Sequence, residues 1–251
     1  MKYFLVPFLF FMSCFAFGQN RQKIDSLIKS LNTEKTIDSA YYNNQLFDIY
    51  FYEIPDSANY YLDKAIKHSQ GNKSKNTIKS YFKKIDYFFY KINTDSLHFF
   101  SKQLSSLIDS VADKSSYRKL LLAKSKIAIN ENKFEQSDSI LENLLKIKKN
   151  DINWQLLAKI FYLKGLTHYK QKEDDNSTLF LNKVDSLYAH YNGMDEVLIN
   201  TNVYRSSLSR TTFTKEGVER AGQYLEEALS ISKTIKLTRL EYIIYFRLAD
   251  Q

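Results

Sequence analysis

Cysteine is almost missing from this sequence. Cys14 is the only one in 251 residues, and it lies in an apolar stretch at the N-terminus. A disulfide within the chain needs two cysteines, and structural zinc sites commonly use several thiolates. The composition therefore excludes both a fold held by internal disulfides and a metal site built from thiolates.

Proline and glycine are also scarce. The chain has two prolines and six glycines, and Pro7 and Gly18 belong to the same N-terminal stretch. Tight β-turns depend on these residue types, so a fold built from many β-hairpins is excluded. We expect long helices joined by short polar connections, in an all-α protein.

The first eighteen residues form a segment of their own. Lys2 precedes an almost wholly apolar run that ends at Phe17, and Ala16 and Gly18 are small residues at the −3 and −1 positions of a cleavage site. This pattern predicts a signal peptide over residues 1–18, so the mature chain would be periplasmic or secreted and have no transmembrane helix. A lipoprotein modified at Cys14 is the alternative, although the apolar run continues beyond that residue.

Positive charge exceeds negative charge. The sequence has 36 Lys and Arg against 28 Asp and Glu, a net charge of +8. Such an excess is typical of many nucleic-acid-binding proteins. Here the lysines are scattered among acids, and the densest basic run, residues 146–149, falls at a predicted helix C-terminus, where cations complement the helix dipole. Together with the export signal, this argues against a nucleic-acid partner for this chain.

Helical periodicity begins directly after the signal segment. Ile24, Leu27, Ile28 and Leu31 follow the i, i+3, i+4, i+7 spacing of one helical face. The pattern predicts an N-terminal helix within residues 19–35.

A pattern with a period of about 40 residues, in the range typical of helical repeat proteins, fills the rest of the chain. The segments that start at Asp56 and Asp95 align without a gap, and looser copies follow. In each copy a small or apolar residue is followed at +4 and +7 by mostly apolar residues. These copies start at Ala58, Leu97, Ser137, Ser177 and Ala221. Between them, further helices are expected over residues 36–53, 75–92, 117–130, 152–171, 196–209 and 238–251.

The small residues of this pattern resemble those of the tetratricopeptide repeat (TPR) family. Gly165, Ser177, Leu181 and Val184 match the family's spacing best. The part of the motif that lies in the second helix of each hairpin is also matched at Ala58, Leu62, Ala65, Ala221, Leu225 and Ala228. The resemblance implies an α-solenoid of antiparallel helical hairpins over residues 36–251, with about five hairpins and an unpaired last helix.

The chain departs from the TPR pattern in several places. The period exceeds the family's usual length, and Trp154 is not at the family's Trp position. The Gly position is occupied by Leu46, Ile85, Ser125 and Ser209 in the other units. Other helical-hairpin repeats therefore remain an alternative.

The TPR resemblance implies a protein or peptide partner, held in a groove lined by the first helix of each hairpin. In the register set by Gly165, the groove positions are Asn43, Tyr50, Lys79, Asp86, Lys126, Lys159, Tyr162 and Tyr169. They mix amide, acidic, basic and aromatic groups, which suits the recognition of a polypeptide.

No catalytic or metal-binding motif stands out. The four histidines, His68, His98, His168 and His190, each lie alone in a predicted helix. The acidic run over residues 173–176 lacks the glycine of a calcium loop. We expect no cofactor, no metal and no enzymatic activity, with His168 as a packing residue and the acidic run as a helix cap.

Two recurring features have two interpretations each. Asp-Ser followed by an apolar residue occurs at Asp25, Asp38, Asp56, Asp95, Asp109, Asp138 and Asp185. Helix capping explains Asp56 and Asp95, whereas exposed copies resemble acceptors of bacterial periplasmic O-glycosylation. The aromatic runs at residues 60–61, 88–90 and 99–100 are expected to pack between helices, and a surface platform is the alternative.

The last predicted helix, residues 238–251, has the apolar pattern of the first helix of a hairpin, but the second helix of that hairpin is missing. It is expected either to continue into a longer protein or to pair with another subunit, which would make it a self-association surface. The layout is similar to the sensor regions of membrane-bound bacterial histidine kinases and helix-turn-helix regulators. A periplasmic sensory input region is therefore the alternative to a free-standing binding scaffold.

Overall fold

All regular structure in the described part of the protein is α-helical, as expected from the sequence. The computed structural model describes residues 21–33, 39–51, 54–68, 74–108, 114–146, 153–235 and 237–249. The predicted signal peptide, residues 1–18, lies outside these ranges. Within them, no helix is long and apolar enough to cross a membrane.

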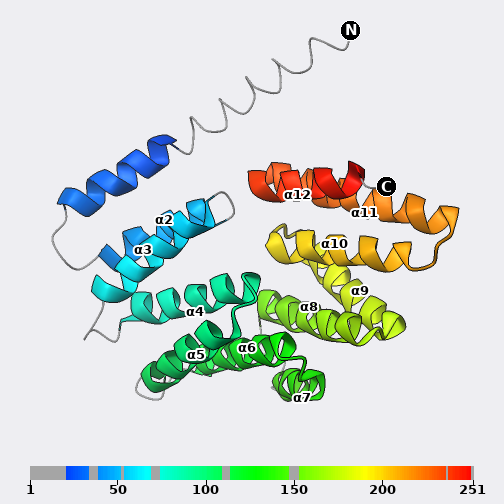
Figure 1. Cartoon of the computed structure of the whole chain (residues 1–251), viewed down its shortest axis with the longest axis horizontal. Helices are drawn as coiled ribbons and strands as arrows, with labels where there is room; N and C mark the ends of the chain where they lie inside the picture. The colour runs from blue at the N-terminus through cyan, green and yellow to red at the C-terminus, as the bar shows by residue number, and fades with distance from the viewer. Residues whose placement is uncertain are drawn as a thin grey trace, which may run out of the picture. The chain divides into compact units, whose positions relative to one another are not determined.

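The chain divides into two compact units, Met1–Tyr87 and Phe88–Gln251. Unit 1 contains a helix over residues 21–33, then α2 (Ser39–Tyr50), α3 (Pro55–His68) and most of α4 (Lys75–Tyr90). Helices α2 and α3 pack against each other (Figure 1). The seam between them is apolar because Ala58, Leu62 and Ala65 of α3 are fully buried, as the repeat pattern predicts.

Unit 2 holds the remaining helices. They are α5 (Thr94–Ile108), α6 (Lys114–Asn130), α7 (Phe134–Leu145), α8 (Trp154–Gln171), α9 (Asp174–Tyr191), α10 (Glu196–Arg210), α11 (Lys215–Thr234) and α12 (Thr238–Ala249). We call the even-numbered helices A helices and the odd-numbered ones from α3 onward B helices. Each helix expected from the sequence is present, and its ends differ from expectation by no more than about one turn.

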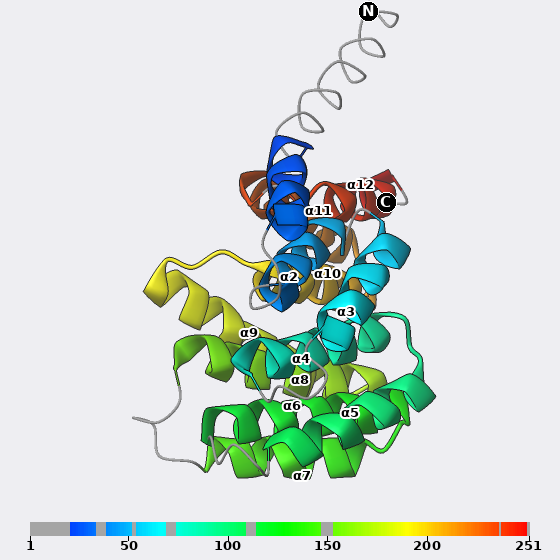
Figure 2. The same cartoon turned by 90° about the vertical axis from the view of Figure 1, so that its left-hand side faces the viewer.

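Contacts in unit 2 follow the order of the chain. Every helix from α5 to α12 packs against the next one, and α8 also contacts both α6 and α10. Helices α10 and α11 lie side by side in Figure 1, and α6 and α7 do so in Figure 2. The A helices α6, α8 and α10 thus each contact a B helix on either side in sequence, and they also touch one another in succession.

Small residues allow close approach within these helix pairs. A Cβ atom added to Gly165 of α8 would lie 2.7 Å from Leu181 Cδ2, and Leu181 of α9 is fully buried. In the α10–α11 pair the glycine is on the other helix, since a Cβ atom on Gly217 would lie 2.6 Å from the Ser209 carbonyl oxygen. The predicted packing residues Ala221, Leu225 and Ala228 of α11 are also fully buried.

The helix caps differ in part from the expectation. Asp95 lies in the first turn of α5, but the cap is Asn93, whose Oδ1 accepts a hydrogen bond from the Ser96 N–H at 3.0 Å. Asn153, Asp195 and Thr214 cap α8, α10 and α11 in the same way. An amide two positions earlier thus takes the role assigned to Asp95, because the helix begins at Thr94.

The last helix is only partly covered. Leu240 and Ile244 of α12 are buried, but Phe246, which belongs to the predicted apolar face, is 69% exposed. The reason is the helical period: Phe246 follows Ile244 by two positions and so points roughly 160° away from it. Self-association through α12 stays a prediction.

Four turns between an A helix and the following B helix contain a residue in the left-handed backbone region. These residues are Ile92, Asn132, Lys172 and Phe213, with φ between 50° and 63°. Glycine and asparagine tolerate this conformation, whereas a β-branched residue is strained in it. Ile92 and Phe213 are also 71% and 93% exposed, so burial gives no compensation.

We therefore expect Ile92→Asn to raise the free energy of unfolding by about 1 kcal/mol, through relief of backbone strain. Chemical denaturation monitored by circular dichroism would measure it. Asn132→Ile, the reverse exchange at the equivalent turn, should destabilise by a similar amount. A loss of stability in Ile92→Asn would show that the Ile92 side chain contributes more than its backbone costs.

Candidate binding face and the ion pairs behind it

The predicted groove residues occupy three kinds of environment. Asn43 is buried, with 1% of its surface exposed, and its amide nitrogen donates to the Ser39 carbonyl oxygen at 2.7 Å. Its assignment to an open groove is therefore wrong. The register placed Asn43 correctly on an A helix, but this side of α2 is covered.

The three predicted groove tyrosines are half-buried in ring contacts. Tyr50 stacks on Tyr61 with a centroid distance of 5.4 Å. Tyr162 and Tyr169 of α8 both contact Tyr204 of α10, at 6.1 and 5.2 Å. Burial raises the pKa of the Tyr162 phenol well above its ordinary value. These rings contribute mainly to packing between helices and expose only part of their surface.

The charged members of the predicted groove are more accessible. Lys79, Asp86 and Lys159 are exposed. Lys126 is half-buried, and its ammonium group lies 5.3 Å from the centre of the Phe89 ring. Lys126 is thus engaged within unit 2, whereas Lys79 and Lys159 can contact a ligand from solvent.

Charge alternates between neighbouring helices from α6 to α9. The A helices α6 and α8 contain no acidic residue. The B helix α7 contains no basic residue, and α9 has Lys183 as its only lysine. The basic side chains of the two A helices are Lys114, Arg118, Lys119, Lys124, Lys126, Lys159, Lys164 and Lys170. Since α6 contacts α8, a surface rich in lysine follows from this sequence pattern.

One lysine position repeats with the period of the chain. Lys79, Lys119 and Lys159 are evenly spaced along the sequence, one repeat apart, on α4, α6 and α8, and all three are exposed. The residues that follow them, Ser80, Leu120 and Ile160, are buried. The equivalent positions on three A helices therefore share both charge and exposure.

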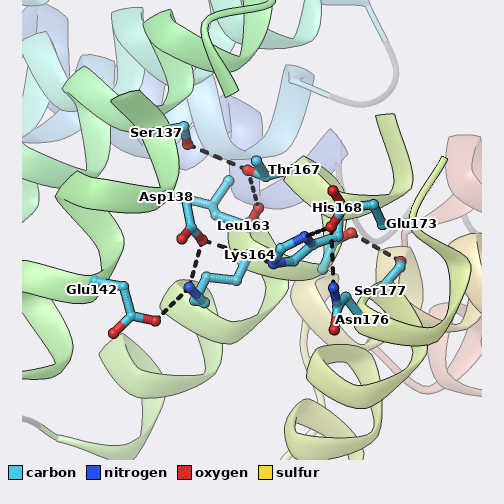
Figure 3. Close-up of polar contacts among 11 residues, drawn as sticks. Ser137, Asp138, Glu142, Leu163, Lys164, Thr167, His168, Glu173, Asn176 and Ser177 are labelled. Atoms are coloured by element: carbon cyan, nitrogen blue, oxygen red, sulfur yellow. Dashed lines mark hydrogen bonds and ion pairs between the residues drawn. The ribbon is translucent and has the colours of Figure 1, made fainter. Parts of the chain in front are cut away.

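Behind this face, a buried lysine joins α8 to α7 (Figure 3). Lys164 is 2% exposed, and its ammonium group lies 2.5 Å from Asp138 Oδ1 and 2.6 Å from Glu142 Oε1. The same group is 4.7 Å from the centre of the Phe180 ring of α9. A buried ammonium group needs such partners, because desolvation disfavours its charged form.

Unit 1 contains the same arrangement. Lys84 of α4 is 1% exposed, and its ammonium group lies 2.5 Å from Asn59 Oδ1 and 2.7 Å from Asp63 Oδ1 of α3. Burial lowers the pKa of the Lys84 ammonium, and Asp63 opposes that shift. Lys83, the preceding residue, pairs instead with Asp48 of α2. Two adjacent lysines of α4 therefore reach two different helices.

His168 of α8 packs as expected and also makes polar contacts. Its ring stacks on Phe180 at 5.4 Å with an interplanar angle of 4°. Nδ1 donates to Glu173 Oε2 at 2.7 Å, as Figure 3 shows. Glu173 is the N-cap residue of α9 but makes no side-chain capping bond. Hydrogen bonds from Asn176 and His168 lower the pKa of its carboxyl group. The acidic run therefore joins the turn to both helices rather than capping α9.

The ring stack of His168 on Phe180 recurs in two other helix pairs. Tyr50 on Tyr61 and Phe88 on Phe100 have the same centroid distance, 5.4 Å, with interplanar angles of 12° and 10°. In each case the A-helix ring precedes the B-helix ring by eleven or twelve positions. This confirms that part of the aromatic runs packs between helices, although Tyr60 and Phe99 are exposed.

The described residues contain no cluster of three or more His, Cys, Asp or Glu that could hold a metal ion. His98 contacts Glu131 at 2.6 Å, and His190 contacts the Tyr191 ring. Comparison with protein-family models finds no family that matches the sequence, and a search among curated proteins finds no match either.

The buried lysines were not anticipated from the sequence. A signal for them existed, because Lys84 follows Asp63 at almost the same sequence separation as Lys164 follows Glu142. Residue type does not distinguish a buried lysine from a solvated one, so only the position of the lysine in the repeat could have indicated its burial.

The energetic role of Lys164 can be tested by removing either side of its ion pair. Asp138→Ala combined with Glu142→Ala leaves a buried ammonium group without carboxylates and should cost about 3 kcal/mol. Lys164→Met removes the charge and keeps most of the volume, so it should cost less than about 1.5 kcal/mol. Urea unfolding would measure both.

The control is Glu226→Ala with Glu227→Ala, two exposed acids of α11. It makes the same change in net charge and should stay within about 0.5 kcal/mol of the native protein. Equal losses in this control and in the Asp138/Glu142 variant would show that net charge, not burial of Lys164, sets the cost.

Proposed function

We propose that this protein is an exported, non-catalytic α-solenoid of stacked helical hairpins that binds an acidic polypeptide segment through the exposed face of its A helices α6 and α8. The contacts of α8 with both α6 and α10 support stacking of one hairpin on the next. The observation that carries the proposal is the charge alternation from α6 to α9, with the repeated lysine position at Lys119 and Lys159 on the two A helices.

The chemistry of such a face favours a flexible acidic ligand. Exposed lysines are strongly hydrated point charges on long stems, so they attract a partner over several ångströms without fixing one geometry. Long-range attraction raises the association rate, and screening by salt weakens it. Half-buried tyrosines beside the lysines, such as Tyr162 and Tyr169, offer partly apolar surface to the ligand's side chains.

The location assigned to this function rests on residues 1–18. Their basic start, apolar run and small residues near Gly18 support export. Outside the cytoplasm, the partner would be an acidic segment of another exported protein, which agrees with the sequence-based exclusion of nucleic acid.

The first test compares charge reversal on A helices with charge reversal elsewhere. In Lys119→Glu, Lys159→Glu, affinity for fluorescein-labelled acidic dodecapeptides, measured by anisotropy at low salt, should fall at least about tenfold. The control is Lys146→Glu, Lys215→Glu, which makes the same charge change at exposed positions at the end of α7 and on α11.

Two results would contradict the proposal. The first is equal loss of affinity in both double variants, which would reduce binding to net charge alone. The second is tighter binding of a single-stranded oligonucleotide than of any acidic peptide at matched ionic strength.

A further inference from the structure

Most A helices hold one side chain that meets the preceding B helix at an equivalent place in the repeat. At the α3–α4 seam Lys84 meets Asp63 at 2.7 Å, and at the α7–α8 seam Lys164 meets Glu142 at 2.6 Å. At the α9–α10 seam Arg205 pairs with Asp185. At the α11–α12 seam the ammonium group of Lys233 lies 5.4 Å from the ring centre of Tyr245. Four seams thus pair a cation with an acid or an aromatic ring.

The α5–α6 seam breaks this rule. Lys124 of α6 lies midway in the sequence between Lys84 and Lys164, one repeat from each. The position equivalent to the acids Asp63 and Glu142 is Lys102 of α5, which lies almost midway between those two. Two lysines therefore occupy the places where the other seams have a cation and its partner.

The surrounding core supports the equivalence. Leu97, Ser101 and Leu104 of α5 are buried, as are Ala58, Leu62 and Ala65 of α3 at the same repeat positions. On the A helices, Ser125 follows Lys124 and is fully buried, just as Ile85 follows Lys84. Helices α5 and α6 are in contact. By repeat equivalence, Lys102 and Lys124 are expected to face each other across the α5–α6 seam, as Asp63 and Lys84 do across the α3–α4 seam.

The two lysines behave differently from their equivalents. Lys84 and Lys164 are almost wholly buried by their partners, whereas Lys102 and Lys124 are both exposed. Among the described residues, no carboxylate forms an ion pair with either of them. The nearby acid Glu131 is engaged with His98 at 2.6 Å and with Lys133 at 3.0 Å. This seam therefore has two lysines at the equivalent positions and lacks the acid found at three of the other seams.

We propose that Lys102 and Lys124 form a binding site for an oxyanion, a carboxylate or a sulfate- or phosphate-type group, which takes the place of the missing acid. Such an anion accepts a hydrogen bond from each ammonium group and supplies the negative charge that a carboxylate supplies at other seams. Because both lysines are exposed, the affinity of a single small ion should be in the millimolar range. The anion would stabilise contact between α5 and α6 by binding only when both helices are in place.

The test uses thermal unfolding of the full chain at constant ionic strength, with two probes. Sodium sulfate, titrated up to ten times its Kd, represents a free oxyanion, and an acetylated tetraglutamate amide represents carboxylates of a polypeptide. At ten times its Kd, either probe should raise the Tm of the native protein by about 2–4 °C. A shift with sulfate alone identifies a small-ion site, and a shift with tetraglutamate alone identifies a docking point for acidic side chains.

Lys102→Glu distinguishes this site from a general effect of salt. The new carboxylate should pair with Lys124, raise the Tm without any added anion by about 2–4 °C, and abolish the response to both probes. Lys102→Gln should abolish the response and give less stabilisation. Lys119→Glu, the same charge reversal on α6 but at the exposed face proposed for peptide binding, should keep the probe response.

Three outcomes would overturn the site: no Tm shift with either probe in the native protein, a shift that persists in Lys102→Glu, or a loss of stability in Lys102→Glu. None of these three outcomes depends on the binding of dodecapeptides. That binding is proposed to involve Lys119 and not Lys102. The two proposals therefore fail separately.

Discussion

Buried ammonium groups determine which helices can be neighbours in this protein. An apolar seam alone is non-directional, so one amphipathic helix could slide along another at little cost. Lys164 removes that freedom, because its charge is stable at this depth only while α7 presents Asp138 and Glu142 to it. Lys84 imposes the same condition on α3 and α4. Apolar burial supplies most of the stabilisation, and the buried lysines add a condition on the register at these two seams.

The helices and their order could be predicted because they depend on local periodicity. The spacing of Ala58, Leu62 and Ala65, and its recurrence once per repeat, carries the information for both the helical face and the repeat. The close approach of α9 to Gly165 could also be predicted, because the absence of a Cβ atom follows directly from the residue type.

The surface could not be predicted to the same degree. Asn43 and Lys159 occupy groove positions in one register, yet the first is buried and the second exposed, because neighbouring helices cover the first. Likewise, the cap at Asn93 instead of Asp95 depends on where α5 begins, which periodicity fixes only to within a turn. Burial and capping are decided by tertiary contacts that no short window of sequence contains.

The charge alternation from α6 to α9 limits the loss of stability that the proposed basic face would cause. Lysines on α6 and α8 repel one another, which destabilises the stack. Acids on α7 and α9 lie on helices that contact α6 and α8, so attraction across those contacts offsets part of the repulsion. Charges of both signs are mixed along the sequence, but in this part of the fold the basic residues lie mainly on α6 and α8 and the acidic residues mainly on α7 and α9.

The equivalence of Lys119 and Lys159 in successive repeats would also set a length in the proposed ligand. Helices in contact, as α6 and α8 are, have axes about 8–10 Å apart, and an extended chain advances about 3.3 Å per residue. A strand crossing the two helices would thus move from one lysine to the next in about three residues. Acids spaced at every third position would meet successive lysines, whereas a run of adjacent acids would leave most of its charges facing water. Spacing in the partner, rather than total charge, would then decide how well it fits.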